Sequence, residues 1–294
     1  MPRYIDPFID FGFKYIFGRE ESKPLLMDFL NELLREEPGF VPIVKIDFLD
    51  KEKIRSGRKT RGVIYDIHCE CSNGRRFTVE MQNQPQPYFF DRIIYYAAKG
   101  IVDQGMAGKD WKYSYLPVYC ISFMKFVMEG YENRFRIEAA LCDLETREPF
   151  SDKLRFIFLQ TPVFGKTYPE ECNTAFERWM YNIINLSEMD TVAFMDQNSV
   201  FKSLDSMASY AMLSEQDRRA YDADVKAYRD LRGQIEYAET KGKEKGRVEG
   251  RAEGRAEEKA EIIKELWQQG MGLDFIAGVA KITVNKVKEI LNID

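Results

Sequence analysis

The stretch RGVIYDIHCECSNGRRFTVEMQNQ, residues 61–84, has the pattern of two β-strands joined by a tight turn. Apolar and polar side chains alternate with a period of two in both halves, and Asn73-Gly74 is a typical turn dipeptide. One face of the first strand carries Val63, Tyr65, Ile67, Cys69 and Cys71, and the other carries Ile64, Asp66, His68 and Glu70. The second strand has an apolar face (Phe77, Val79 and Met81) and a polar one (Thr78, Glu80 and Gln82). We therefore predict a β-hairpin whose chemistry lies on one face.

Two turn lengths are compatible with this hairpin, and they give different pairings. A two-residue turn sets Ile67 opposite Glu80 and mixes apolar with polar side chains on one face. A three-residue turn over Ser72–Gly74, with Gly74 left-handed, sets Ile67 opposite Val79. The same turn sets Asp66 opposite Glu80. Because a one-residue slip exchanges the two faces of a strand, the hydrophobic pattern selects the three-residue turn.

In that register the carboxylates of Asp66 and Glu80 stand side by side, with about 4.5–5.5 Å between their Cβ atoms. Like charges at this separation repel unless a proton or a cation lies between them. Mg²⁺ is bound through one or two carboxylates and keeps several waters, so the pair is a candidate magnesium site. Spacing alone equally allows a half-exposed hairpin with a polar outer face and no metal.

The hairpin resembles the signature of the PD-(D/E)XK nuclease superfamily, in its Rpn branch of recombination-promoting nucleases and transposases. That signature is an Asp on one strand followed by Glu-x-Gln at the end of the next, which are Asp66 and Glu80-Met81-Gln82 here. Other matching pieces are Asp10-x-x-Phe13-Lys14-x-x-Phe17, Phe29-Leu30-Asn31, Arg92-x-x-Tyr95-Tyr96 and Tyr115-Leu116-Pro117-Val118-Tyr119. The resemblance covers roughly residues 6–190 and rests on the order and spacing of these pieces together.

The resemblance implies a metal-dependent DNA endonuclease linked to recombination or transposition, with DNA as its partner and Mg²⁺ as its cofactor. It implies that Asp66, Glu80 and the Met81 carbonyl bind the metal and that Gln82 orients the attacking water. The Lys of the superfamily motif is Gln82 here, as is usual in this branch, and an amide can only hydrogen-bond. Either Lys14 or Arg92 then supplies the missing base or cation, or activity is weak.

The missing Lys also favours an alternative, in which the chain is a catalytically decayed module that binds DNA or a protein partner. A transposase that uses three acidic residues fits less well, because no third acidic residue stands at the required place. Under the nuclease hypothesis, Asp10 and Lys14 face the carboxylate hairpin, although the aromatic segment around them could equally serve only to pack on the core.

The composition indicates a globular protein, with 45% hydrophobic and 14% aromatic residues in 294. Its net charge of −5 means that nucleic acid must be bound by a local basic patch. The best candidate is a loop with six Lys and Arg residues from Lys51 to Arg61, which a solvated loop explains equally well. Glu52 in this loop is a weaker candidate for a further carboxylate.

A single histidine, His68, excludes zinc sites that need two His ligands. A hydrolase triad would have to use His68 itself, and we interpret it as a polar lining residue. The five cysteines (69, 71, 120, 142 and 172) lie in apolar contexts without a CxxC motif, as expected of buried thiols in a reducing cytoplasm. Neither a signal peptide nor a membrane-spanning run of about 18 apolar residues is expected.

These patterns predict an α/β fold, a PD-(D/E)XK-like mixed sheet flanked by helices, with a helical C-terminal half. The sheet contains strands 42–49, 61–71, 75–83 and 116–127, with further strands at 135–141 and 154–159. Predicted helices cover residues 23–36, 90–106, 170–186, 190–209 and 214–269. We expect a nuclease-like domain over residues 1–190, a helical extension over 191–240, a charged Gly-containing helix or linker over 241–261, and a small helix-turn-helix-like terminus over 262–294.

The long polar helix contains Gly242, Gly246, Gly250 and Gly254 at a spacing of four. Because Gly weakens a helix interior by about 1 kcal/mol relative to Ala, this stretch is either frayed or allows close approach of a partner helix. A homo-oligomer through the C-terminal helix is therefore a candidate assembly. The terminal segment is expected to pack Leu266, Ile276, Val279 and Val287 into a small core.

Overall fold

The computed structural model describes residues 2–49, 66–106 and 112–293. It divides into two compact units, Met1–Lys226 and Ala227–Asp294. The basic loop from Lys51 to Arg61 and the candidate carboxylate Glu52 lie outside the described residues. Their suggested roles therefore stay predictions.

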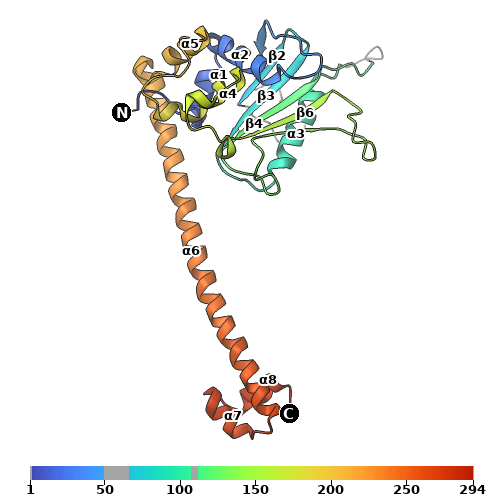
Figure 1. Ribbon diagram of the computed structural model, residues 1–294, viewed down its shortest axis with the longest axis vertical. Helices are drawn as coiled ribbons and strands as arrows, with labels where there is room; N and C mark the ends of the chain where they lie inside the picture. Colours follow the sequence, from blue (N-terminus) through green and yellow to red (C-terminus); the bar gives the residue numbers. More distant parts are fainter. Residues whose placement is uncertain (1, 50–65, 107–111, 294) are drawn as a thin grey trace. The chain divides into compact units, whose positions relative to one another are not determined.

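A six-stranded mixed sheet forms the centre of the first unit, with strand order β1-β2-β3-β4-β6-β5 (Figure 1). The strands are β1 Ile46–Phe48, β2 Ile67–Cys71, β3 Arg75–Gln82, β4 Val118–Met124, β5 Arg136–Ala140 and β6 Leu154–Gln160. β3 pairs antiparallel with β2 and parallel with β4, and β4 pairs parallel with β6. The predicted mixed sheet is confirmed, although its first and fourth predicted strands are shorter than expected.

Helices account for most of the remaining structure and for the C-terminal half. The α-helices in the described ranges are α1 Asp10–Phe17, α2 Lys23–Leu34, α3 Phe89–Val102, α4 Ala175–Asn185, α5 Ser199–Ala208, α6 Glu215–Gln268, α7 Leu273–Ala280 and α8 Val284–Leu291. α4 and α5 begin later than predicted because polar residues cap them. The Thr174 hydroxyl accepts the Glu177 N–H, and the Asn198 side chain accepts the Val200 N–H.

The helices α1, α2 and α4 lie close together on one side of the sheet (Figure 1). The odd-numbered residues of β3 and β4 face the aromatic core that these helices form. Phe123 of β4 packs against Phe13 and Phe29 at ring-centroid distances of 5.8 and 5.3 Å. Trp179 of α4 joins this cluster through Phe29, at 6.0 Å. The start of α6 is tied to the same layer, since the Asp6 N–H donates to the Tyr221 hydroxyl at 2.8 Å.

α3 covers the other face of the sheet. It is the crossover between the parallel strands β3 and β4, a connection that places the intervening helix against the sheet. Its buried residues Phe89, Ile93 and Ala97 pack against the even-numbered residues of β4 and β6. The polar face of the hairpin therefore lies under a helix and not in solvent.

In the second unit the end of α6 packs with α7 and α8 around a small core. Its buried residues are Ile263, Ile276, Ala277, Ala280 and Val287, with Leu266 partly buried. The predicted core position Val279 is wrong, because its side chain is 51% exposed. Val279 and Phe275 lie one turn apart on α7, and both are exposed.

Gly12 in α1 provides a test of this packing. A Cβ atom at this position would lie 2.1 Å from the backbone oxygen of Asp6, so Gly12→Ala should lower the free energy of unfolding of the first unit by about 3 kcal/mol. At Gly233 nothing lies within 4 Å of a built Cβ atom, and Gly233→Ala should not destabilise the protein. Calorimetric melting of both variants measures the difference, and equal melting temperatures would contradict the close contact at Gly12.

Candidate active site

The hairpin has the predicted register. Ile67 pairs with Val79, and Gly74 is left-handed with φ 73°. Asp66 directly precedes β2 and so comes opposite Glu80. Its Oδ2 accepts the Met81 N–H at 2.9 Å, and its own N–H lies 3.4 Å from Glu80 Oε1. The two carboxylates thus meet at the end of the hairpin.

The Met81 carbonyl points to the same side as Asp66. Even-numbered residues of β3 bond to β4, since the Arg76 N–H donates to Pro117 O at 2.8 Å and Gln82 O accepts the Lys125 N–H at 2.9 Å. Successive residues of a strand direct their backbone groups to opposite edges. Met81 therefore directs both its N–H and its C=O away from β4, and the N–H reaches Asp66.

Burial makes this acidic pair reluctant to ionise. Glu80 is only 5% exposed, and its burial, together with the charge of Asp66, raises its pKa to about 8. Burial also raises the pKa of Asp66, although the hydrogen bond from Met81 and the positive charge of Lys14 oppose it. Without a cation between them, the pair retains a proton at neutral pH.

Lys14 of α1 reaches this pair from the neighbouring layer. Its Nζ lies 3.5 Å from Asp66 Oδ1 and 2.6 Å from Asp10 Oδ1. Burial alone would lower the pKa of Lys14, but the hydrogen bond to Asp10 and the charge of Asp66 outweigh it, and the pKa is raised. Lys14 is consequently a cation at neutral pH and not a base.

Arg92 of α3 approaches from the opposite direction and contacts Gln82. Its guanidinium donates to Gln82 Oε1 at 2.5 Å and also to Gln86 Oε1. Because a guanidinium has only donors, these contacts fix the Gln82 oxygen toward Arg92. The Gln82 NH₂ group is then directed away from Arg92, as a hydrogen-bond donor. Arg92 also lowers the pKa of Glu80, against the larger effects of burial and Asp66.

Sequence reasoning missed Ser122. It pairs with Glu80 in the parallel register of β3 and β4, so their side chains share the face under α3. Ser122 is fully buried, and in the described ranges its hydroxyl has no hydrogen-bond partner. A single serine in the otherwise apolar and aromatic run Val118–Met124 was the available signal.

His68 lies on the same polar face, as the alternation predicted. It is 7% exposed, and its Nδ1 lies 3.1 Å from Thr78 Oγ1. Burial, with the nearby charge of Arg76, lowers its pKa to about 4, so the imidazole is neutral at pH 7. A Ser-His-Asp arrangement is not formed by these contacts.

The oxygen atoms at this place fit a hard cation. Asp66, Glu80 and the Met81 carbonyl offer oxygen ligands only, and Mg²⁺ needs few protein ligands of this kind. Within the described ranges, no three or more His, Cys, Asp and Glu side chains gather closely enough to hold a metal. A cation here would therefore depend on two carboxylates, a carbonyl and water.

All five cysteines are free thiols, and four are buried.

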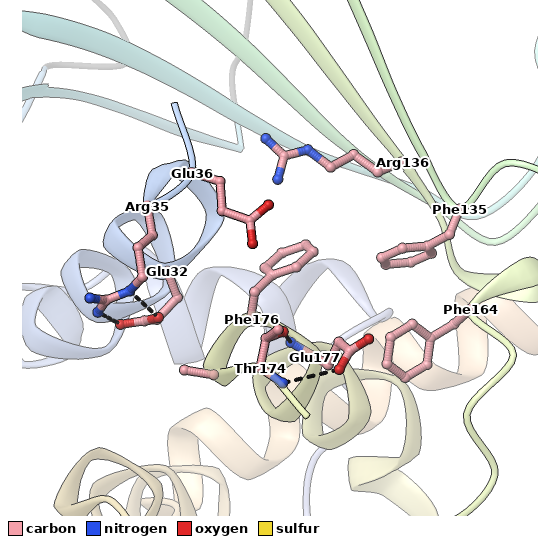
Figure 2. A pocket seen from close by; sticks show the side chains of 10 residues that line it. Glu32, Arg35, Glu36, Phe135, Arg136, Phe164, Thr174, Phe176 and Glu177 are labelled. Atoms are coloured by element: carbon pink, nitrogen blue, oxygen red, sulfur yellow. Dashed lines mark hydrogen bonds and ion pairs between the residues drawn. The ribbon is translucent and has the colours of Figure 1, made fainter. Parts of the chain in front are cut away.

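A separate cavity of about 620 Å³ lies on the opposite side of the sheet, between α2, α4 and the start of β5 (Figure 2). Several of its charged groups already have partners. Arg35 pairs with Glu32, and Glu177 accepts the Thr174 N–H at 3.1 Å (Figure 2). None of the acidic pair, Lys14 or Arg92 lines it, so it is not part of the candidate active site.

The six-stranded mixed sheet with flanking helices is a PD-(D/E)XK-like α/β fold. The chain belongs to the PD-(D/E)XK nuclease family transposases, whose family model matches residues 7–238. Nucleases of this kind typically use divalent metal ions and act on DNA. No curated protein and no solved structure gives a significant match. No helix in the described ranges has the length and apolar character to cross a membrane.

The raised pKa of Glu80 predicts how metal-free stability depends on pH. The folded state holds this proton up to about pH 8, whereas the unfolded chain releases it near 4.5. The free energy of unfolding should therefore fall as the pH rises through that range. Glu80→Gln mimics the protonated carboxyl group. In EDTA, its free energy of unfolding should therefore exceed that of wild type by on the order of 3 kcal/mol at pH 8.5 and by little at pH 5.

Denaturant unfolding of both proteins at the two pH values measures this difference. Glu148→Gln, on an exposed turn, is the control and should change stability equally at both pH values. An unchanged gap between wild type and Glu80→Gln from pH 5 to 8.5 would contradict the buried, proton-retaining state of Glu80.

Proposed function

We propose that this protein is a Mg²⁺-dependent DNA endonuclease that hydrolyses phosphodiester bonds during recombination or transposition. The observation that carries the proposal is the buried pair Asp66 and Glu80, whose charge the surrounding residues only partly offset. A pair that retains a proton when metal-free gains most from a divalent cation, because the cation replaces the proton and removes the repulsion.

Asp66, Glu80 and the Met81 carbonyl would hold the cation. When bound, Mg²⁺ supplies a Lewis acid for the phosphodiester and lowers the pKa of a coordinated water. The remaining work falls to side chains of this chain. The Gln82 NH₂ group donates a hydrogen bond to the attacking water or to a phosphoryl oxygen, in the place where the superfamily has Lys.

Two cations then offset the negative charge that develops on the phosphorane. Lys14, held by Asp10 and Asp66, lies on the α1 side, and Arg92 lies behind Gln82. Preorganised donors of this kind stabilise charge that develops in a transition state. Since Lys14 is a cation, the proton of the attacking water leaves to solvent or to a phosphate oxygen and not to Lys14.

One observation favours a second function, a DNA- or protein-binding module without catalysis. Gln82 donates a hydrogen bond but carries no charge, so the site lacks the ammonium group of the superfamily motif. Under this alternative the acidic pair still binds metal, and DNA is bound but not cut. The plasmid assay below separates the two functions.

Supercoiled-plasmid nicking tests the catalytic proposal directly. Wild type should nick with Mg²⁺ and not with EDTA, and Asp66→Asn and Glu80→Gln should each lower the rate at least 100-fold, because each removes a ligand charge. Glu148→Gln should nick like wild type. Titration calorimetry with Mg²⁺ gives a readout independent of activity. Nicking that survives in both site variants would overturn the assignment of the site.

We also propose that the chain self-associates through the C-terminal helix. Residues 236–259 of α6 are exposed throughout, and Gly242, Gly246, Gly250 and Gly254 leave open space on it. Charge pairs along this stretch, such as Lys245 with Glu249 at 3.7 Å, show charges that could also pair across a contact. The domain boundaries near residues 190, 240 and 261 and a cytoplasmic location remain predictions.

Light scattering of the full chain and of residues 1–240 tests self-association. The full chain should form the larger assembly, because only it keeps the four Gly positions, while the truncated chain should retain the sheet by circular dichroism. The same number of chains per particle in both samples would leave the helix as a solvated spacer.

A further inference from the structure

A second cavity, of about 680 Å³, opens where β3 and β4 end. Its walls come from the segment before α3, the first turn of α3 and the segment after β4. Its lining includes Gln86, Tyr88, Phe89, Asp91, Phe126 and Glu129. The volume is in the range of sites for small organic groups, about 300–1,000 Å³. The carboxyl ends of parallel strands are a common place for such sites in α/β folds.

This cavity, called here the α3 cavity, is joined to the acidic pair by a single side chain. Arg92 donates to Gln86, which lines the cavity, and to Gln82, which follows Glu80 by two residues on β3. The hydrogen-bonded chain Gln86–Arg92–Gln82 thus connects a group in the α3 cavity to the site of the proposed hydrolysis.

Four of the ten residues that line the α3 cavity are aromatic: Tyr88, Phe89, Phe90 and Phe126. Phe89 packs edge-on against Phe126 at a centroid distance of 5.9 Å. Tyr88 is 81% exposed and lies at the N-cap of α3 with φ 62°, a left-handed conformation that is uncommon for a bulky side chain. Its side chain makes no cap hydrogen bond and is largely exposed, so the Tyr88 side chain contributes neither capping nor core packing to the fold.

The wall after β4 is held in place by Gln160, which is fully buried at the end of β6. Gln160 Oε1 accepts the Met128 N–H at 2.5 Å, and its Nε2 donates to the backbone oxygens of Tyr131 and Arg134 at 2.8 and 2.6 Å. The cavity is therefore formed without any ligand to order it.

The charges of the α3 cavity select its occupant. Within the described part of the chain, the carboxylates of Asp91 and Glu129 form no ion pair or side-chain hydrogen bond. Two carboxylates repel a phosphate, but they accept hydrogen bonds from the amino groups of nucleobases. Aromatic rings stack on the faces of any base. This combination suits an uncharged aromatic ring with amino donors and excludes the sugar-phosphate backbone.

We infer that the α3 cavity receives one unpaired nucleobase of the strand that is cut. The inference rests on the proposed function and specifies its substrate, which is DNA with at least one base out of the duplex, either single-stranded or with a bulged base. Tyr88 and Phe126 stack on the base, Asp91 and Glu129 accept from its amino groups, and Arg92 links its position to the acidic pair.

The test uses the full-length Glu80→Gln variant, which is expected to cut at least 100-fold more slowly than wild type, with Mg²⁺ present. Binding is measured by fluorescence anisotropy for three probes: a single strand, a perfect duplex, and the same duplex with one bulged base. In further versions of each probe, 2-aminopurine replaces one base at a time, at successive positions along the strand. The single strand and the bulged duplex should bind about tenfold or more tightly than the perfect duplex, and 2-aminopurine emission should change at one position.

Adding Tyr88→Ala should weaken binding of the two unpaired probes by about 5- to 100-fold, the range of base–aromatic stacking, and should abolish the change in emission. Tyr88 is exposed, so this change leaves the core intact. Tyr168→Ala, at an exposed tyrosine (64%) outside the cavity lining, is the matched control and should bind like the parent.

Equal affinity of the parent and the Tyr88→Ala variant for all three probes would overturn the α3 cavity as a base site, and so would a preference for the perfect duplex. If wild type nicks plasmid in those cases, the proposed nuclease function stands. If wild type neither nicks nor binds any probe, the proposed function itself fails.

Discussion

β3 is hydrogen-bonded on both sides, antiparallel to β2 and parallel to β4, and this position determines the surroundings of the site. The antiparallel side brings Asp66 to Glu80. The parallel side requires a crossover, and the crossover helix α3 covers the face that carries Glu80 and Gln82. A hairpin alone would leave these side chains in water, where two carboxylates interact weakly. Beneath α3 the same pair is buried, so the two carboxylates repel each other more strongly and the pKa of Glu80 is raised.

The surrounding cations reduce this repulsion without removing it. Lys14 divides its charge between Asp66 and Asp10, and Arg92 donates to two amide oxygens. The pKa of Glu80 is still raised to about 8. The metal-free fold therefore keeps a destabilised acidic pair. Stability given up at an active site for binding a ligand is a common trade-off in enzymes. The buried, unpaired hydroxyl of Ser122 beside Glu80 belongs to the same pattern.

Local pattern was enough to predict the hairpin, its three-residue turn and its register, because a shift by one residue would have placed Ile67 with Glu80. The family resemblance, and not the local pattern, indicated Lys14 and Arg92 as the residues that supply a base or a cation near the pair. The contact between Arg92 and Gln82 depends on how α3 crosses the sheet, and no spacing in the sequence reports that. For the same reason alternation could not tell a solvent-facing polar side from one covered by a helix. Val279 was misplaced because α7 has apolar residues on more than one side, so periodicity did not identify its buried face.

The replacement of the motif Lys by Gln82 has a physical counterpart in Arg92. A Lys at position 82 would put an ammonium group beside a guanidinium that already points there, and two adjacent cations disfavour each other. With Gln82 at this position, the positive charge stays on Arg92, which donates to the Gln82 side chain. Donation from Arg92 to the amide oxygen polarises the amide, and linked hydrogen bonds of this kind strengthen one another. In the proposed mechanism the Gln82 NH₂ group is then a stronger donor than an isolated amide, and it acts at the place where the ammonium group would act. In the proposed mechanism, Arg92 on α3 supplies the positive charge and Gln82 on β3 supplies the hydrogen bond. A single Lys would provide both. That division makes the position of α3 part of the proposed catalytic arrangement.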